Sequence, residues 1–306
     1  MREENDYICG MRRMRIILLV MAALVTLASA YGQGPGQPER LTWVTTPADS
    51  LLAESILAGL KARIRADDAA GKVRPATAEL MVMAGKALEG QPYVAGTLDE
   101  LPSERLCIYL TRTDCILYVE TCLALARTAQ QGGDFKDFAN ELKQSRYRDG
   151  RISSYADRLH YTTEWARQGE ARGVLTDVSR ALGGEPLDHP IDYMSRHPGS
   201  YPLMDDVQAI RAVEERLNSQ PRYYIPKNRL GGALKGIRAG DIICLATSIE
   251  GLDISHVMMV LSNDGGNVRL IHASTGPMKV VEEPRTLSQY LAARSSVTGI
   301  QVLRPL

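Results

Sequence analysis

A cysteine lies at the start of a predicted helix, in the stretch TRTDCILYVE from Thr111 to Glu120. Thr113 is a suitable N-cap, and the apolar run begins after Cys115, which places the thiol at about the second helical position. Unpaired backbone N–H groups and the helix dipole favour a thiolate there, and can move a thiol pKa from about 8.5 into the range of about 3.5–7.5. Asp114 would oppose this effect if its carboxylate pointed at the sulfur. The pattern favours Cys115 as a nucleophile, with a buried structural cysteine as the alternative.

A nucleophilic thiol needs a base, which the fold rather than the neighbouring sequence must supply. His256 begins a predicted strand, in ISHVMMV, and His272 ends its predicted partner strand, in LIHAS. Hairpin pairing can bring both imidazoles to the same end of the sheet. One ring would then accept the thiol proton while the other orients it through the far ring nitrogen, as a Cys–His–polar triad requires. Two ordinary strand-end histidines are the alternative, and we expect no role for the loop residues His189 and His197.

Other chemistries receive less support. A zinc site could combine the two histidines with Cys115 or a carboxylate, but the chain has no C-x-x-C and no H-E-x-x-H. It also has no G-x-S-x-G for a serine hydrolase. A P-loop and a G-x-G-x-x-G are absent as well, so nothing supports a nucleotide enzyme. We therefore expect neither a metal ion nor a cofactor.

The composition is that of an ordinary globular protein. The 306 residues include 36 Lys and Arg against 36 Asp and Glu, with 44% hydrophobic and 24% charged residues. No basic stretch is long enough to bind nucleic acid through its charge. We expect a monomer that binds no nucleic acid.

The first thirty residues have the composition of an export signal. MRRMR at positions 11–15 is positive, and the apolar run at 16–28 is too short to span a bilayer comfortably. Ala28-Ser29-Ala30 fits an A-x-A cleavage site. We expect cleavage after Ala30, export to the bacterial periplasm or medium, and no membrane attachment afterwards; an uncleaved anchor is the alternative. Residues 31–40 are a flexible tether rich in Gly and Pro.

The cysteine count does not indicate a disulfide scaffold. After loss of the leader the chain keeps Cys107, Cys115, Cys122 and Cys244, too few to staple a fold of this size. A bridge between Cys107 and Cys244 stays open in an oxidising compartment. A bridge through Cys115 would exclude its role as a nucleophile.

The first half of the chain has helical periodicity and the second half has strands. An apolar stripe of Leu51, Leu52, Ile56, Leu60 and Ile64 follows a proline at a permitted first helical position. Further helices are predicted at about 75–88 and 115–129, from 134, and at 205–217; the span 150–202 is irregular and too long to be a passive connection. Strands are predicted at 223–226, 241–246, 255–261, 268–273, 278–281 and 298–303, with a hairpin turn at 263–267. Helices first and antiparallel strands second indicate an α+β fold.

The order of several short motifs resembles a known family, the NlpC-type cysteine peptidases, which are papain-like enzymes of bacterial cell-wall turnover. The motifs are QPYVAGT at 91–97, Asp114-Cys115, AGDII at 239–243, Ser255-His256-Val257 and Ile271-His272-Ala273. Each is weak alone, but their order and spacing over residues 90–305 make the resemblance fairly specific. The segment DRLHYTTEW at 157–165, together with the D-C-x-x-x-V-E helix, looks like the N-acetylmuramoyl-L-alanine amidase-like branch.

The resemblance implies a papain-like core, with the Cys helix packed against an antiparallel sheet or barrel. Residues 41–306 would form a single catalytic domain. Within it, residues 41–90 would be N-terminal helices and residues 150–202 a substrate-specificity insert. The V-M-M-V after His256 departs from relatives, in which small residues are common there.

The resemblance also implies roles for individual residues. Cys115 would be the nucleophile, His256 the base and His272 the polar third member. Tyr93 matches the family tyrosine near the oxyanion position, where its phenol and the Cys115 backbone N–H could stabilise a tetrahedral intermediate.

The insert then becomes a candidate specificity element. Arg158 could pair with a peptide carboxylate, and His160 and Tyr161 could hydrogen-bond to the sugar or the lactyl amide. Trp165 could stack on a sugar ring or belong to the core, and Glu120 could bridge to the insert. The other substrate-binding candidates are Asp114 and Ser255.

We therefore expect an exported cysteine amidase that cleaves the amide between N-acetylmuramic acid and L-alanine through a thioester. Its partners would be soluble peptidoglycan fragments, muropeptides, with 1,6-anhydro sugar ends as one option. An endopeptidase that cuts γ-D-glutamyl-diaminopimelate bonds is the alternative within the same fold. A non-catalytic cell-wall-binding protein is the alternative outside enzymology.

Overall fold

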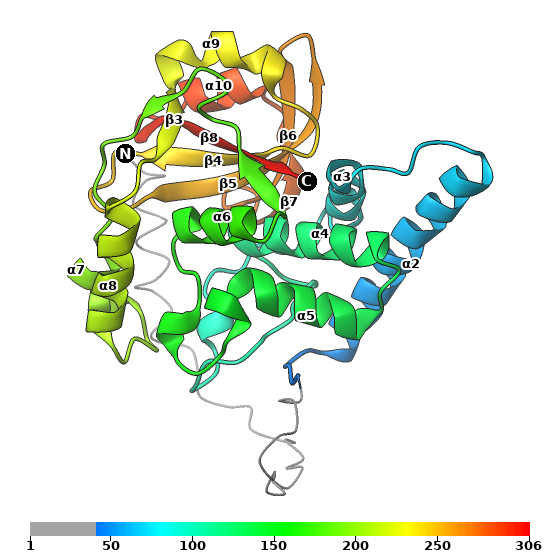
Figure 1. Ribbon diagram of the computed structural model, residues 1–306, viewed down its shortest axis with the longest axis horizontal. Coiled ribbons are helices and arrows are strands. Elements are labelled where there is room, and N and C mark those ends of the chain that lie inside the picture. The colour runs from blue at the N-terminus through cyan, green and yellow to red at the C-terminus, as the bar shows by residue number, and fades with distance from the viewer. Residues whose placement is uncertain (1–40) are drawn as a thin grey trace, which may run out of the picture. The chain divides into compact units, whose positions relative to one another are not determined.

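Helices and one antiparallel sheet build the part of the chain that the structure describes (Figure 1). The computed structural model describes residues 41–306, and Trp43–Leu306 form one compact unit. The predicted leader and tether, residues 1–40, lie outside the described residues. The combination of helices with an antiparallel sheet confirms the predicted α+β class.

The sheet of the described residues has eight strands in the order β2-β3-β8-β4-β5-β6-β7, with β1 paired to β8. All of these pairs are antiparallel. The strands are β1 (Leu175–Asp177), β2 (Glu185–Pro186), β3 (Tyr223–Pro226), β4 (Ile242–Thr247), β5 (Ile254–Asp264), β6 (Asn267–Ser274), β7 (Lys279–Glu282) and β8 (Val297–Pro305). Six of them overlap the strands predicted from the sequence, and the predicted hairpin turn joins β5 to β6.

β4 lies in the middle of the sheet, and its sequence suits this place because both faces of the strand are buried. All six residues of IICLAT are buried, the pattern of a strand covered from both sides. One face carries a core in which Ile243 and Leu245 pack with residues of α9 (Leu230–Ala233) and α10 (Leu287–Ala292). On the other face α4 (Cys115–Gln130) contacts β5 and β6. Figure 1 shows α9 and α10 on one side of the sheet and α4 on the other.

The remaining helices surround α4 and the edge of the sheet. They are α2 (Pro47–Ala69), α3 (Thr77–Ala87), α5 (Phe135–Arg146), α6 (Thr162–Ala171), α7 (Tyr193–Arg196) and α8 (Val207–Asn218), with the short 3₁₀ helices η1 (Thr97–Asp99), η2 (Arg148–Gly150), η3 (Tyr155–Asp157), η4 (Pro198–Ser200), η5 (Lys227–Arg229) and η6 (Leu234–Gly236). α2 and α3 both pack on α4.

α2 begins where the sequence predicts, but its buried stripe differs from the predicted one at its start. The Thr46 side chain caps the helix by accepting the Asp49 N–H at 3.2 Å, and proline occupies the first turn. Leu51, predicted to lie in the apolar stripe, is exposed. The buried apolar residues are Ala53, Ile56, Leu57, Leu60 and Ile64, so Ala53 and Leu57 are buried in addition to three residues of the predicted stripe.

The span 150–202 has local structure of its own. It contains α6, α7 and two short strands, and its apolar side chains join those of α8 in a second core. Tyr155, Tyr161, Ile191 and Met194 belong to this core. Within residues 41–306, no helix combines the length and apolar character needed to cross a membrane. All four cysteines of the described residues are free, including Cys107 and Cys244.

Candidate active site

Cys115 is the first residue of α4, and the cap of this helix is Asp114 rather than the predicted Thr113. Asp114 has extended backbone angles, and its Oδ1 accepts the Leu117 N–H at 2.9 Å. Thr113 is unsuited to capping because its backbone is already paired on both sides. Its N–H donates to the Pro92 carbonyl at 3.0 Å, and its own carbonyl accepts from Val94 at 2.8 Å.

The Cys115 sulfur contacts the backbone of β5. The backbone N–H of Val257, the residue after His256, donates a hydrogen bond to the thiol. The register between β5 and β6 begins only at Met259, which pairs with Ile271, so residues 254–258 of β5 pair with β4 alone. The tip of α4 therefore meets β5 where this strand has separated from β6.

The environment of Cys115 favours a neutral thiol. The side chain is 8% exposed. Burial, and after it the Asp114 carboxylate, raises the pKa of the thiol to about 12, against hydrogen bonds from the N–H groups of Val257, Ile116 and Cys115 itself. The expected thiolate is therefore wrong for the free protein, because desolvation outweighs the effect of the helix N-terminus.

His256 and His272 contact each other directly. His256 Nε2 lies 2.7 Å from His272 Nδ1, and the rings meet edge to face with centroids 4.9 Å apart. Their strands are neighbours, so the hairpin brings the two rings together as the spacing predicts. The contact leaves Nδ1 of His256 as the ring nitrogen for the thiol proton.

Both imidazoles are neutral near neutral pH. The pKa of His256 is well below its usual value, first because the ring is buried and then because His272 and Arg294 disfavour a second positive charge. Burial also lowers the pKa of His272, to about 4, although Glu283 opposes the change. The resting site thus combines an uncharged thiol with an uncharged base.

Glu283 is a buried carboxylate at this site that the sequence analysis did not select. Its Oε2 lies 3.4 Å from His272 Nε2, and its Oε1 accepts from Arg285 Nε at 2.7 Å. It directly follows β7, and its N–H donates to the Leu270 carbonyl of β6 at 2.9 Å. The sequence offers two consecutive glutamates here, and only the strand register decides that Glu283 turns inward while Glu282 pairs with Lys86 at the surface.

Tyr93 lies in a short frame that links the β6–β7 turn to the start of α4. Its N–H donates to the Met278 carbonyl at 2.9 Å, and it forms a parallel bridge with Thr113. Met278 has φ 54°, a left-handed conformation that is uncommon for a residue other than glycine. The bridge therefore places Tyr93 beside Thr113, two residues before Cys115.

The guanidinium of Arg158 is already paired inside the protein. Its Nη2 lies 2.7 Å from Asp99 Oδ1 and 2.6 Å from Glu104 Oε2. Glu120 is likewise bound to Arg146, with 2.7 Å between Oε2 and Nη2. These two predicted substrate residues therefore hold loops and helices near α4, and the structure gives neither of them a free charge.

The other insert residues have internal partners as well. His160 Nε2 contacts the Tyr155 carbonyl at 2.8 Å, and burial lowers the pKa of this histidine to about 3. The Tyr161 hydroxyl donates to Glu214 at 2.7 Å. Trp165 is buried, and its Nε1 donates to a serine hydroxyl of α5 at 3.1 Å.

Ser255 is near the base but bonded to the sheet. Its hydroxyl donates to the Leu245 carbonyl of β4 at 3.3 Å. It is half-buried in the separated part of β5. Of the predicted residues, the structure thus gathers Cys115, His256 and His272 around the end of β5, and places the insert residues in the surrounding framework.

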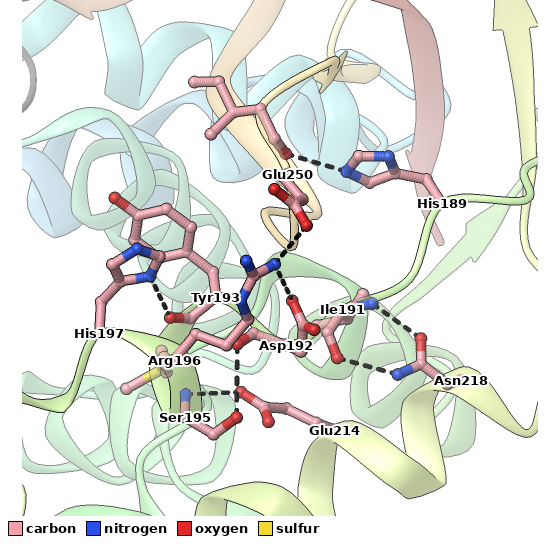
Figure 2. A network of polar contacts seen from close by, with 12 residues as sticks. His189, Ile191, Asp192, Tyr193, Ser195, Arg196, His197, Glu214, Asn218 and Glu250 are labelled. Carbon is pink, nitrogen blue, oxygen red and sulfur yellow. Dashed lines mark hydrogen bonds and ion pairs between the residues drawn. The ribbon is translucent and has the colours of Figure 1, made fainter.

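The insert is fastened to the turn that leads into β5 (Figure 2). His189 Nε2 lies 3.0 Å from the carbonyl oxygen of Ile249 in this turn. Arg196 of α7 lies 2.6 Å from Glu250. His197 Nδ1 lies 2.8 Å from a carbonyl oxygen of its own helix. The two loop histidines thus contact backbone carbonyls, and the segment braces the chain just before the base-bearing strand.

No group of three or more His, Cys, Asp or Glu side chains in residues 41–306 is arranged to hold a metal ion. The expectation of a site without metal or cofactor stays a prediction.

The described residues thus combine an α+β fold, a cysteine at the start of α4 and a pair of contacting histidines on β5 and β6. The N-acetylmuramoyl-L-alanine amidase-like (AmiA-like) family model matches residues 83–300. This chain therefore belongs to that family. No curated protein matches the chain.

Solved structures agree with the family. The crystal structure of an N-acetylmuramoyl-L-alanine amidase from Bacteroides uniformis is 35% identical with TM-score 0.70, covering 75% of this chain and 99% of that one. A Bacteroides fragilis protein named as a candidate xylanase is 38% identical with TM-score 0.67, covering 72% and 99%. A Legionella pneumophila protein, 20% identical with TM-score 0.61 over 85% and 96%, is similar in fold alone.

Proposed function

We propose that this chain is a cysteine-dependent amidase that hydrolyses the N-acetylmuramoyl–L-alanine bond of peptidoglycan fragments. One observation carries the proposal: the Cys115 sulfur accepts from the backbone N–H of Val257, next to His256, and Nε2 of His256 contacts Nδ1 of His272. We infer from this placement that Cys115, His256 and His272 form a Cys–His–polar triad. We infer the reaction from membership in the amidase-like family and the substrate class from the similarity to the B. uniformis amidase.

The reaction begins from a neutral thiol and a neutral imidazole. The Cys115 proton passes to Nδ1 of His256 while the sulfur attacks the lactyl carbonyl carbon of the muramoyl group. When the tetrahedral intermediate collapses, the C–N bond breaks and His256 gives the proton to the leaving amine of L-alanine. Water then attacks the thioester with His256 as base, which releases the muramic acid carboxylate and restores the thiol.

We infer two donors for the oxyanion. The Cys115 backbone N–H belongs to the first residue of α4, so it has no acceptor within the helix. The Tyr93 frame lies against the segment that enters this helix, and its phenol would be the second donor. Such preorganised donors stabilise the charge that forms only in the intermediate.

The proposal includes a papain-like core of the NlpC type, export through the predicted leader and action as a monomer in the periplasm or medium. The insert of residues 150–202, braced against the turn before β5, would roof the site and favour soluble muropeptides over intact wall. Its buried ion pairs suit a rigid support of the site better than direct contacts with substrate.

Digestion of a defined disaccharide-peptide followed by mass spectrometry tests the proposal. Release of a peptide with a free L-alanine amine supports it, whereas a dipeptide left on the sugar identifies the endopeptidase. Cys115→Ala should abolish turnover and keep the fold; turnover that survives this change refutes the nucleophile. Binding without any cleavage by the wild type identifies the wall-binding protein, and xylan serves as a control substrate because of the B. fragilis relative.

A further inference from the structure

We propose that Glu283 is a positioning residue for the candidate base: acting through His272, its carboxylate fixes the tautomer and the orientation of His256. This role rests on the proposed function of the site. It adds a fourth group to the three that a Cys–His–polar triad contains.

His256, His272 and Glu283 form a chain of side-chain contacts. His256 Nε2 lies 2.7 Å from His272 Nδ1, and His272 Nε2 lies 3.4 Å from Glu283 Oε2. The His272 side chain is 1% exposed and the Glu283 carboxylate is buried beside it. This approach is at ion-pair distance, and His272 Nε2 makes no hydrogen bond within residues 41–306; hydrogen bonds between catalytic groups are often long or poorly aligned before substrate binds.

The carboxylate determines where each proton sits. An ionised carboxylate only accepts hydrogen bonds, so the neutral His272 ring carries its proton on Nε2. Its Nδ1 is then a lone pair, which can only accept from the Nε2–H of His256. Nδ1 of His256 becomes the lone pair for the thiol proton. Without Glu283, His272 could carry its proton on Nδ1 and donate it to Nε2 of His256. His256 would then carry its own proton on Nδ1, which could no longer accept the thiol proton.

The surroundings keep Glu283 ionised. Burial raises its pKa, but hydrogen bonds and charge from Arg285 outweigh burial, so the pKa lies below its usual value. The guanidinium carbons of Arg294 and Arg285 lie 3.9 Å and 5.0 Å from the centre of the Tyr290 ring, and this ring packs edge to face against His272. Both arginines disfavour protonation of His272. Among Glu283, Arg285 and Arg294, only Glu283 carries the negative charge that can stabilise an imidazolium while the thiol proton is on His256.

Nitrogen-15 NMR of histidine-labelled protein reads the tautomers directly. We expect Nε2–H tautomers for His256 and His272 in the wild type and in Glu283→Gln, whose amide oxygen can still accept. In Glu283→Ala we expect His272 to gain Nδ1–H and His256 to follow. The matched control is Glu282→Gln, the neighbouring surface glutamate that pairs with Lys86, which should match the wild type.

Alkylation of Cys115 by chloroacetamide, followed by mass spectrometry, gives a second readout that needs no substrate. At pH 7 we expect Glu283→Ala to react roughly 10- to 100-fold more slowly than the wild type, the rate equivalent of one hydrogen bond to a charged group. Glu283→Gln should fall between them. Thermal unfolding confirms that each variant is folded, and the milder Gln variant keeps the test open if the Ala variant is not.

Unchanged tautomers together with unchanged alkylation rates in folded Glu283 variants would overturn the positioning role. The proposed reaction has its own test: if muropeptides are not cleaved by the wild type but the tautomers shift in Glu283→Ala, the amidase function falls and the positioning role stands.

Discussion

Replacement of Glu120 by alanine should destabilise the fold rather than weaken substrate binding. Glu120 lies in the middle of α4 and forms an ion pair with Arg146 of α5. Its Oε2 accepts a hydrogen bond from Arg146 Nε at 2.8 Å and lies 2.7 Å from Nη2. The two side chains are 3% and 5% exposed. Arg146 also donates to the Cys107 carbonyl, so the pair ties two helices to the segment that precedes the nucleophile.

The size of the effect follows from burial. Removal of one partner of a buried ion pair leaves an uncompensated charge and costs about 3–5 kcal/mol. Total stabilities of domains are about 5–15 kcal/mol, so Glu120→Ala should consume a large part of the free energy of unfolding. Glu120→Gln keeps an acceptor for Arg146 and should cost less, about 1.5–3 kcal/mol, the contribution of hydrogen bonds to charged groups.

Urea unfolding followed by circular dichroism measures these changes. The control is Glu100→Gln, which breaks the Glu100–Arg112 pair; its distance is 2.6 Å, but its side chains are 41% and 32% exposed, so about 0–1 kcal/mol is expected. The double variant Glu120→Leu/Arg146→Met should lose much less than the sum of the single losses, because no charge stays buried. If Glu120→Ala is as stable as the control variant while KM for a muropeptide rises, the structural reasoning is wrong and Glu120 binds substrate.

Three further predictions concern the thiol, the oxyanion donor and the packing of α3. Because the pKa of Cys115 is about 12, its alkylation rate in His256→Ala, which lacks the candidate base, should rise about tenfold per pH unit between about pH 7 and 10; a plateau already near pH 8 would show that the thiol ionises normally. Tyr93→Phe should lower kcat about 10²–10³-fold with an unchanged melting temperature, and steady-state kinetics that match the wild type would remove the phenol from the reaction. An added Cβ at Gly85 would overlap the Met259 side chain, so Gly85→Ala should cost about 1–3 kcal/mol in urea unfolding. Gly59→Ala, a helical position with open space around it, should instead stabilise by up to about 1 kcal/mol, and equal effects at the two sites would contradict the packing argument.

The insert shows why residue type alone did not assign roles. Arg158 and Trp165 are residues that bind carboxylates and sugars in many sites, and the sequence contains no sign of what they meet. In the structure Arg158 is neutralised by Asp99 and Glu104 from another segment, and Trp165 is buried. Partners so distant along the chain are set by the packing of the insert, which periodicity does not report.

The sequence by itself determined the helices and strands, and the order in which the candidate catalytic residues lie on them. Alternating and all-apolar runs specified the strands, and the turn at 263–267 fixed a hairpin that carries His256 and His272 to one end of the sheet. The start of α4 was also readable, because a capping residue followed by an apolar run is a local signal. These properties depend on neighbours within a few residues.

Only the tertiary structure decided the electrostatics of the site. The cap fell to Asp114 because the backbone of Thr113 is taken by a distant segment. The Cys115 thiol is neutral because it is buried against β5, and Glu283 reached the histidines through the register of β6 and β7. Solvation and charge depend on everything that packs around an atom, and that surrounding is assembled from parts of the chain up to about 170 residues apart.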